Sequence, residues 1–338
     1  MNPKYLFRLA RTPHVFARLR IARDAVPWIR MQFLSTALEA GLLETLRTPR
    51  SRTELVELLA VKREDLLDVL LAVGVAVKEL ARSNGSYRIR GQRAKALLGK
   101  GGDPLGALVR EIVSLHGPAY VGFTERLKGG ELAQHTTGSG DLIARSSRIV
   151  EPFMQLFLEK VIDRSQPQRL LEVGCGSGIY LRHAASLNSA IQGVGLEMQA
   201  EVVQQAEANL NDWGLNGRFK IVQGDIRNPP SEVDGTFDLL TLYNNIYYFT
   251  LEERPALYSN LLSRLAPGGL FILVSMMQGN SCTASDLDLL LRSTIGWEPL
   301  PDVGELVEDL GRAGFMNIRK HQLISWEPFF GLVCNKEG

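Results

Sequence analysis

The chain has 338 residues, more than one hydrophobic core usually serves, so we expect more than one domain. Its 38 basic and 37 acidic residues leave a net charge of +1, which excludes attraction to nucleic acid or to an anionic membrane through an overall field. With 45% hydrophobic and 22% charged residues, the composition is that of an ordinary globular protein, and we expect its partner to be a small molecule rather than nucleic acid.

Residues 1–30 carry seven Lys or Arg side chains and one acid, Asp24, interleaved with apolar residues. Two interpretations are open: a basic amphipathic segment that touches a membrane, and a helix that packs on its own subunit or on a partner. We favour the packed helix and expect no stable membrane association. No small-residue cleavage site follows a continuous apolar stretch, so we predict no secretory signal.

The first hundred residues show a pattern of three helices and a β-hairpin. Residues 31–47 place apolar side chains at helical spacing, a capping box at Ser51 begins a second helix, and residues 63–76 form a third. The dipeptide Asn84-Gly85 then separates two short strand patterns, which is the strongest short-range indication of a hairpin. Residues 1–100 are therefore predicted to form a mainly helical, winged-helix-like domain.

The rest of the chain divides into a helical bridge and an α/β region. A helical pattern broken by turn-rich stretches covers residues 101–165, and we predict that it roofs a substrate site. From residue 166 onward, apolar strands alternate with glycine turns and helices, which is typical of parallel βαβ units. Uninterrupted apolar strands fit a sheet covered on both faces. The predicted fold class is therefore α/β, with a Rossmann-like doubly wound sheet in residues 166–338. The strand sequences are RLLEV, IQGVGL, FKIVQG, FDLLTL and LFILVS.

The residues that carry chemistry follow the first of these strands, in the sequence EVGCGSG. Glycines there let the backbone turn tightly and approach a ligand, and the N-terminus of the next helix offers free amides. Glu172 would repel a pyrophosphate but could accept hydrogen bonds from a cationic amino group. Ile179 stands where a dinucleotide site would have Gly or Ala. Glu197 and Asp225 end the next two strands, so three acids are expected to face one crevice at the carboxyl edge of the sheet.

The three cysteines, Cys175, Cys282 and Cys334, lack metal-ligand spacing and cannot all pair with one another. Free thiols are typical of a reducing compartment, so we predict a cytoplasmic protein without a metal site. The longest apolar run covers residues 69–77 and is too short to cross a bilayer.

Over residues 168–275, five motifs in order resemble class I S-adenosylmethionine-dependent methyltransferases: EVGCGSG, the strand-end Glu197, GDI, FDLLTLYNN and LAPGGLFILV. The resemblance implies S-adenosyl-L-methionine as cofactor, with Glu172 and the glycine loop at its methionine part, Glu197 at both ribose hydroxyls and Asp225 at the adenine amine. The predicted cofactor-binding residues are Glu172, Gly174, Cys175, Gly176, Gly178, Glu197, Met198, Asp225, Ile226 and Asn244.

The first half resembles the winged-helix dimerisation domain that precedes this fold in small-molecule O-methyltransferases of plant and bacterial secondary metabolism. The segment LSTALEAGLLETL, the hairpin and the helix that begins at Asp103 carry this likeness. It implies a homodimer that methylates a small aromatic or polyketide-like acceptor. Oxygen is the favoured methyl acceptor atom, and carbon or nitrogen is the alternative.

One position departs from that O-methyltransferase family. Counting back from PGG places the family's general-base histidine at Tyr247, and an unperturbed phenol is a poor base at neutral pH. We therefore predict as catalytic residues Asn245 and Tyr247, which orient the acceptor, and His116, the leading base candidate ahead of His135. The predicted substrate-binding residues are Tyr120, Arg148, Phe153, Tyr248 and Met277.

Other functions stay open beside this one. Methyl transfer can run on proximity alone, because the sulfonium is already an activated donor. A regulator that senses S-adenosylmethionine and binds DNA through the winged helix is opposed by the acids Glu64, Asp65 and Asp68, which surround Arg63 on the third helix. A homologue that has lost its chemistry is opposed by the intact cofactor motifs.

Overall fold

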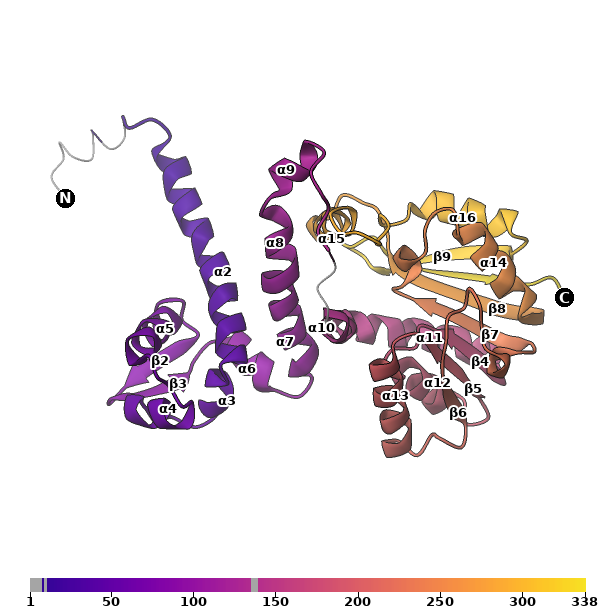
Figure 1. Ribbon diagram of the computed structural model, residues 1–338, viewed down its shortest axis with the longest axis horizontal. Coiled ribbons are helices and arrows are strands. Elements are labelled where there is room, and N and C mark those ends of the chain that lie inside the picture. Colours follow the sequence, from indigo (N-terminus) through magenta and orange to yellow (C-terminus); the bar gives the residue numbers. More distant parts are fainter. Residues whose placement is uncertain (1–7, 9–10, 135–138) are drawn as a thin grey trace. The chain divides into compact units, whose positions relative to one another are not determined.

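The computed structural model describes residues 8, 11–134 and 139–338 (Figure 1). His135, the second base candidate, lies outside the described residues. The chain divides into two compact units, residues 1–114 and 115–338. The predicted domain boundaries lay near residues 100 and 165, so the predicted bridge, residues 101–165, contributes to both units.

The N-terminal unit has the winged-helix arrangement that the sequence predicts. Helices α2, α4 and α5 precede a hairpin of β2 and β3, and a short strand β1 adds to β3 in the antiparallel order β1-β3-β2. Buried side chains such as Leu34, Leu55 and Leu71 form its core. The elements are α2 (Val15–Glu39), α3 (Leu42–Thr45), β1 (Arg50–Ser51), α4 (Arg52–Leu58), α5 (Glu64–Ala76), β2 (Leu80–Ser83), β3 (Ser86–Ile89), α6 (Gln92–Leu98) and α7 (Gly102–Glu111), followed by a π-helical turn (Ile112–His116).

Local residue choices explain most of these boundaries. The Ser51 hydroxyl accepts from the Glu54 amide and the Glu54 carboxylate accepts from the Ser51 amide, which is the predicted capping box. Asn84 and Gly85 both have positive φ, as a two-residue hairpin turn requires. The single helix predicted over residues 31–47 is wrong in one respect. The chain leaves the helix after Glu39 because Gly41 adopts a φ of 69°.

The C-terminal unit is built on a seven-stranded sheet of order β6-β5-β4-β7-β8-β10-β9. The first five of these strands pair in parallel, as predicted. Its elements are α8 (Gly117–Tyr120), α9 (Phe123–Leu127), α10 (Ser139–Ser146), a 3-10 turn (Ser147–Val150), α11 (Glu151–Ser165), β4 (Arg169–Val173), α12 (Ile179–Leu187), β5 (Gln192–Glu197), α13 (Ala200–Asp212), β6 (Phe219–Gln223), a 3-10 turn (Ser231–Val233), β7 (Phe237–Tyr243), a 3-10 turn (Ile246–Tyr248), α14 (Arg254–Ser263), β8 (Leu265–Met276), α15 (Cys282–Arg292), α16 (Val303–Arg312), β9 (Met316–Ile324) and β10 (Phe329–Asn335).

The last two strands make the sheet mixed rather than wholly parallel, a feature that the sequence analysis lacks. Strand β10 pairs antiparallel with β8 on one side and with β9 on the other, so that Leu332 lies opposite Leu273. Strand β9 forms the edge of the sheet, and most of its side chains are exposed and polar. An edge strand of this kind has no apolar pattern by which a sequence could reveal it.

Helices cover both faces of the sheet, as Figure 1 shows. On one face, side chains of α14 and α16, including Leu257 and Leu306, pack on Leu171 and other strand residues. On the other face, side chains of α11 and α12, including Phe157 and Leu181, pack on Leu170. Successive side chains of β4 point to opposite faces of the sheet, and both faces are covered. The strand is therefore apolar almost throughout. Within the described part of the chain, no helix is long and apolar enough to cross a membrane.

Candidate functional site

The candidate site lies where the direction of the parallel strand order reverses. The chain runs from β4 outward through β5 and β6, and then returns to build β7 and β8 on the other side of β4. The reversal therefore falls between β4 and β7. In sheets of this kind ligands bind in the crevice outside the carboxyl ends of the strands at this point.

The glycine loop after β4 is held in shape by the neighbouring strands. Gly174, Gly176 and Gly178 all have positive φ, which side chains rarely adopt. The amides of Gly174 and Cys175 donate to the Leu196 carbonyl at 2.7 and 3.1 Å, and the Cys175 side chain is buried in the core with Leu170 and Leu181. Strand β5 and the core therefore hold the loop in its conformation.

Asn245 fastens this loop from across the strand reversal. Its Nδ2 donates to the Val173 carbonyl at 2.8 Å. A Cβ on Gly174 would lie 2.3 Å from that Nδ2, so only glycine fits beneath the amide. The Asn245 Oδ1 is buried and accepts no hydrogen bond. The structure thus places the predicted catalytic Asn245 against the glycine loop.

Glu172 is a carboxyl group enclosed by protein. It is 1% exposed, and its Oε2 has no hydrogen-bond partner. Burial and the negative charge of Glu197 raise its pKa well above the ordinary value. A buried acceptor without a donor is costly, so this group is a candidate for a ligand that brings a positive charge or a hydrogen-bond donor.

Two tyrosines, the buried Tyr243 and the half-buried Tyr180, lie near Glu172. The rings of Tyr180 and Tyr243 meet edge to face with centroids 5.0 Å apart. Burial raises the pKa of both phenols, and the Glu172 charge raises both further. Both phenols therefore stay protonated and neutral, so neither brings a positive charge to Glu172. Neither tyrosine was predicted from the sequence, because neither belongs to a recognisable motif.

Glu197 at the end of β5 binds three backbone amides. Its Oε2 accepts from Gly176 at 3.1 Å, and its Oε1 accepts from Met198 at 2.9 Å and from Gln199 at 3.1 Å. The carboxylate thus joins the glycine loop to the chain that enters α13. The predicted residue Met198 is exposed beside it.

Asp225, which follows β6, is paired with an arginine that the sequence analysis missed. Its Oδ1 accepts from the Arg227 amide at 2.9 Å, and its Oδ2 accepts from the Arg227 Nε at 2.8 Å. Burial raises the Asp225 pKa, but these hydrogen bonds outweigh burial and lower the pKa below its ordinary value. The neighbouring Ile226 side chain is buried in the core.

The turn after β7 carries two tyrosines that belong to a cluster of aromatic side chains. Asn244 has a φ of 52°, and its amide donates to the Val274 carbonyl at 2.7 Å. The Tyr247 and Tyr248 rings lie 4.8 Å apart, and Tyr248 also meets Trp297 edge to face at 6.2 Å. Tyr248 is 39% exposed. An aromatic surface therefore borders the carboxyl end of β7.

His116 is linked to a carboxylate that is distant in sequence. Its Nδ1 lies 2.5 Å from Oδ2 of Asp286, and the Tyr120 hydroxyl donates to Oδ1 of the same residue at 2.6 Å. The structure thus joins a predicted catalytic residue to a predicted substrate-binding residue through Asp286. Asp286 was not predicted, because nothing in the local sequence of α15 distinguishes it from other surface acids.

Comparisons with known proteins agree with this geometry. Residues 170–269 match the family model described as a methyltransferase domain. The chain is 26% identical over 100 residues to the rRNA N(6)-adenosine-methyltransferase metl-5 of Caenorhabditis elegans (29% of this chain, 46% of the relative). It is 29% identical over 106 residues to the mitochondrial ubiquinone biosynthesis O-methyltransferase of Schizosaccharomyces pombe (31% and 37%). The chain thus spans less than half the length of either relative.

Solved structures resemble the chain over nearly its whole length. The mitomycin 7-O-methyltransferase MmcR superposes with a TM-score of 0.78 at 18% identity, covering 95% of this chain and 98% of that one. PigF with SAH gives a TM-score of 0.76 at 20% identity, with 94% and 99% covered. Human N-acetylserotonin methyltransferase in complex with SAM gives 0.76 at 13% identity, with 97% and 99% covered. At these identities the likeness shows that the fold of both halves is shared.

The remaining predicted substrate residues lie in different surroundings. Arg148 pairs with Glu151 at 3.2 Å. Phe153 packs at the edge of the core that α11 shares with the sheet. Met277 is fully buried on the opposite face, and its amide donates to the Pro328 carbonyl. The structure does not bring these three side chains together.

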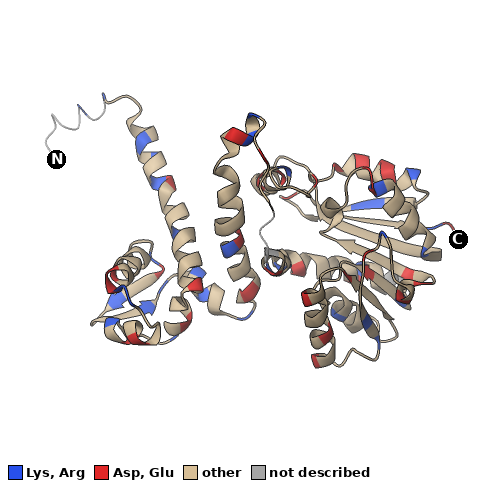
Figure 2. Ribbon diagram, in the orientation of Figure 1, with Lys and Arg blue, Asp and Glu red and all other residues tan. Residues whose placement is uncertain are grey.

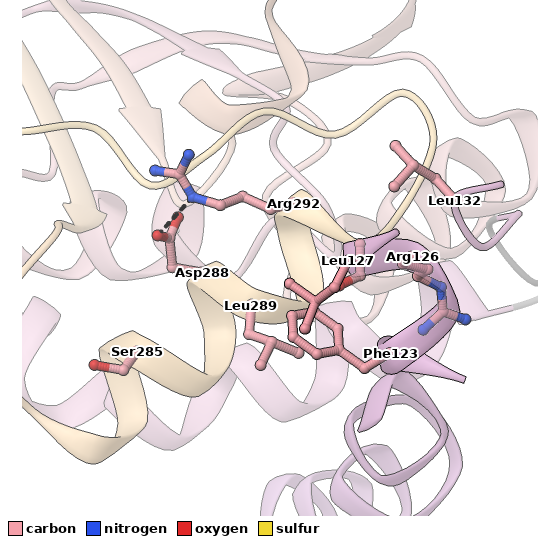
Figure 3. A pocket seen from close by; sticks show the side chains of 9 residues that line it. Phe123, Arg126, Leu127, Leu132, Ser285, Asp288, Leu289 and Arg292 are labelled. Atoms are coloured by element: carbon pink, nitrogen blue, oxygen red, sulfur yellow. Dashed lines mark hydrogen bonds and ion pairs between the residues drawn. The ribbon is translucent and has the colours of Figure 1, made fainter. Parts of the chain in front are cut away.

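An open pocket of about 390 Å³ lies between α9 and α15 (Figure 3). Phe123, Leu127 and Leu289 gather at one side of it, and the Asp288–Arg292 ion pair stands on α15. None of the predicted site residues lines this pocket. Among the described residues, no cluster of His, Cys, Asp or Glu could hold a metal ion.

Proposed function

We propose that this protein transfers a methyl group from S-adenosylmethionine to a small-molecule acceptor, with oxygen as the favoured acceptor atom. The observation that carries the proposal is Glu172, a buried carboxyl whose Oε2 has no hydrogen-bond partner, beside a glycine loop held by β5 and by Asn245. The methionine part of the cofactor ends in an ammonium group, which would bring both the charge and the donors that Glu172 lacks. The site therefore fits the cofactor.

The other strand-end acids suit the remaining parts of the cofactor. Glu197 has carboxylate lone pairs beyond those that its three backbone amides use, and these can accept from ribose hydroxyls. Asp225 is kept ionised by Arg227 and can accept from an adenine amine. No atom lies within 4 Å of the position that a Cβ of Gly176 would take, so a ligand can approach the backbone there. The cofactor, when bound, supplies a methyl group on a positively charged sulfur.

The acceptor is proposed to be a small aromatic or polyketide-like molecule. Tyr248 and Trp297 offer partly exposed rings beside the carboxyl end of β7, and ring edges and faces attract aromatic ligands. Asn245 would act by holding the glycine loop, and Tyr247 by orienting the acceptor. The names of MmcR and human N-acetylserotonin methyltransferase support a small-molecule acceptor. Methylation of carbon or nitrogen is the alternative, because the family's general-base histidine is replaced by Tyr247.

We propose further that the N-terminal unit forms a homodimer with a second copy of the chain. Large apolar side chains on the first turns of α2 are exposed, among them Phe16 at 76%, Ile21 at 71% and Trp28 at 64%. Exposed apolar surface of this extent marks an interaction site. A DNA-binding role has less support, because Arg52 and Arg63 pair with the acids of α5, and both charges are interspersed on these helices (Figure 2).

The proposed function is tested with the purified full-length chain. We expect calorimetry to detect S-adenosylmethionine binding, and NAD at the same concentration not to compete. Incubation with catechol, caffeic acid and 1,3-dihydroxynaphthalene, and with aniline as the nitrogen counterpart, should release S-adenosylhomocysteine with at least one hydroxyl acceptor. A chain that does not bind S-adenosylmethionine, or that binds NAD in its place, would contradict the proposal.

A further inference from the structure

Asp286 joins two side chains that lie about 170 residues earlier in the chain. One of its oxygens is 2.5 Å from Nδ1 of His116, and the other accepts from the Tyr120 hydroxyl at 2.6 Å. The side chains of His116 and Asp286 are 12% and 28% exposed. Water therefore has limited access to the pair, and the carboxylate is held by a partner on each oxygen.

This contact determines which ring nitrogen of His116 can act as a base. A carboxylate at Nδ1 accepts the Nδ1 hydrogen and fixes that tautomer of the neutral ring. A proton taken up by the ring then goes to Nε2, and the resulting positive charge lies beside the carboxylate. The hydrogen bond to Asp286 raises the pKa of Tyr120 to about 12, so the phenol remains a donor and holds Asp286 in place.

The two segments that carry these residues are fixed to each other, and α15 packs near the carboxyl ends of β7 and β8. Helix α15 begins shortly after β8 ends, and its Leu287 packs in the same apolar cluster as Tyr247. Backbone hydrogen bonds join Ala133 to Ser293 and to Ile295 at 2.8 and 2.9 Å. The segment that contains His116 is thus fastened to α15 through Asp286 and to the residues directly after α15 through Ala133, and α15 packs near the turn that carries Tyr247.

We propose that Asp286 is the positioning residue of a His116–Asp286 pair that deprotonates a hydroxyl acceptor. This inference rests on the proposed function. As the acceptor oxygen forms its bond to the methyl carbon, its proton passes to Nε2 of His116, and the electron pair of the broken carbon–sulfur bond stays on sulfur. The products are a methyl ether, S-adenosylhomocysteine and an imidazolium, which returns its proton to solvent.

The first test reads the ring directly and needs no acceptor. Long-range ¹H–¹⁵N spectra of the full chain with labelled histidine report the tautomer of each ring, and the His116→Gln variant assigns the His116 signal. We expect the Nδ1–H tautomer in the wild type. In Asp286→Asn the amide can present an N–H to Nδ1, so the ring should shift toward the Nε2–H tautomer. An unchanged tautomer in that variant would overturn the proposal.

The second test uses whichever of catechol, caffeic acid or 1,3-dihydroxynaphthalene is turned over fastest. Asp286→Asn should lower kcat by about 10²- to 10⁴-fold and move the acid limb of the kcat/KM profile to lower pH, with cofactor affinity unchanged. The matched control is Asp288→Asn, which removes another ion-paired carboxylate of α15 and should leave the profile in place. Wild-type kcat and pH profile in Asp286→Asn would overturn the proposal.

The two tests distinguish failure of this inference from failure of the proposed function. Absence of S-adenosylmethionine binding by the wild type would contradict the proposed function and the inference together. Normal turnover in both His116→Gln and Asp286→Asn would discard the His116–Asp286 pair and leave the methyltransferase assignment intact. If none of the three phenols is turned over, the tautomer comparison decides the positioning role alone.

Discussion

Replacing Glu172 by Gln tests the buried carboxyl through the stability of the empty protein. Its pKa in the folded protein is raised above 4.5 by burial and by Glu197, so the folded state keeps a proton that the unfolded chain releases. Stability is therefore fully present below a pH of 4.5 and is lost as the pH rises through the folded pKa. Glutamine does not ionise. We expect Glu172→Gln to be more stable than the wild type at pH 8, with a difference that disappears toward pH 4.5.

The same substitution should weaken cofactor binding. A hydrogen bond to a charged group contributes about 1.5 to 3 kcal/mol, which corresponds to a factor of about 10 to 150 in Kd. Binding of an ammonium group should also force Glu172 to ionise, so the wild type should release a proton on binding and the variant should not. Calorimetry at one pH in two buffers of different ionisation enthalpy measures both the affinity and the protons released.

Each of these expectations can fail separately. A Glu172→Gln protein that unfolds at lower temperature than the wild type at pH 8 would contradict the costly burial of the carboxyl. Unchanged affinity and unchanged proton release would show that Glu172 does not face the ammonium group. The matched control is Glu201→Gln on the exposed side of α13, which should alter neither stability nor binding.

Three further predictions concern the rest of the molecule. Glu197→Ala should weaken S-adenosylmethionine binding at least about tenfold, because each lost charge-assisted bond contributes about 1.5 to 3 kcal/mol; equal affinity in calorimetry would remove Glu197 from the site. Tyr247→Phe should lower kcat with the best phenol and leave cofactor affinity alone if the hydroxyl orients the acceptor, and unchanged kcat would discard that role. Removal of all residues before 140 should abolish the dimer in light scattering, and a stable dimer of the shortened chain would disprove our placement of the interface.

The sequence predicts those parts of the fold that repeat a local pattern. Strands β4 to β8 are apolar because both faces of the sheet are covered. Each is followed by a turn or a helix that can be recognised from its own sequence pattern. Strand β9 could not be found this way, because Arg319, Lys320 and their neighbours face solvent at the sheet edge. The break at Gly41 was missed because Leu42 and Leu46 continue the helical spacing and are buried regardless of the break.

The residues of the candidate site also fall into those that a local sequence pattern predicts and those that depend on the fold. Glu172, Glu197 and Asp225 could be named because parallel strands bring their carboxyl ends together. Asn245 was predicted to orient an acceptor, and that role stays a prediction. The hydrogen bond from its amide to the Val173 carbonyl could not be predicted, because the two residues lie 72 positions apart and meet only in the folded sheet. Asp286 could not be named at all, since its relation to His116 depends on how α15 packs.

The contacts of the glycine loop affect how much conformational freedom a ligand costs. Asn245 holds the loop from the turn after β7, and Glu197 holds it from β5 through the Gly176 amide. A loop that is already ordered loses little further conformational freedom when a ligand arrives, which favours affinity. Glu197 therefore has two effects that act in the same direction, since it orders the loop and offers oxygens to the ligand. Glu172 has the opposite character, because burying a carboxyl whose Oε2 has no hydrogen-bond partner costs stability, and a bound ammonium group would relieve that cost. One acid thus prepares the site and the other favours its occupation.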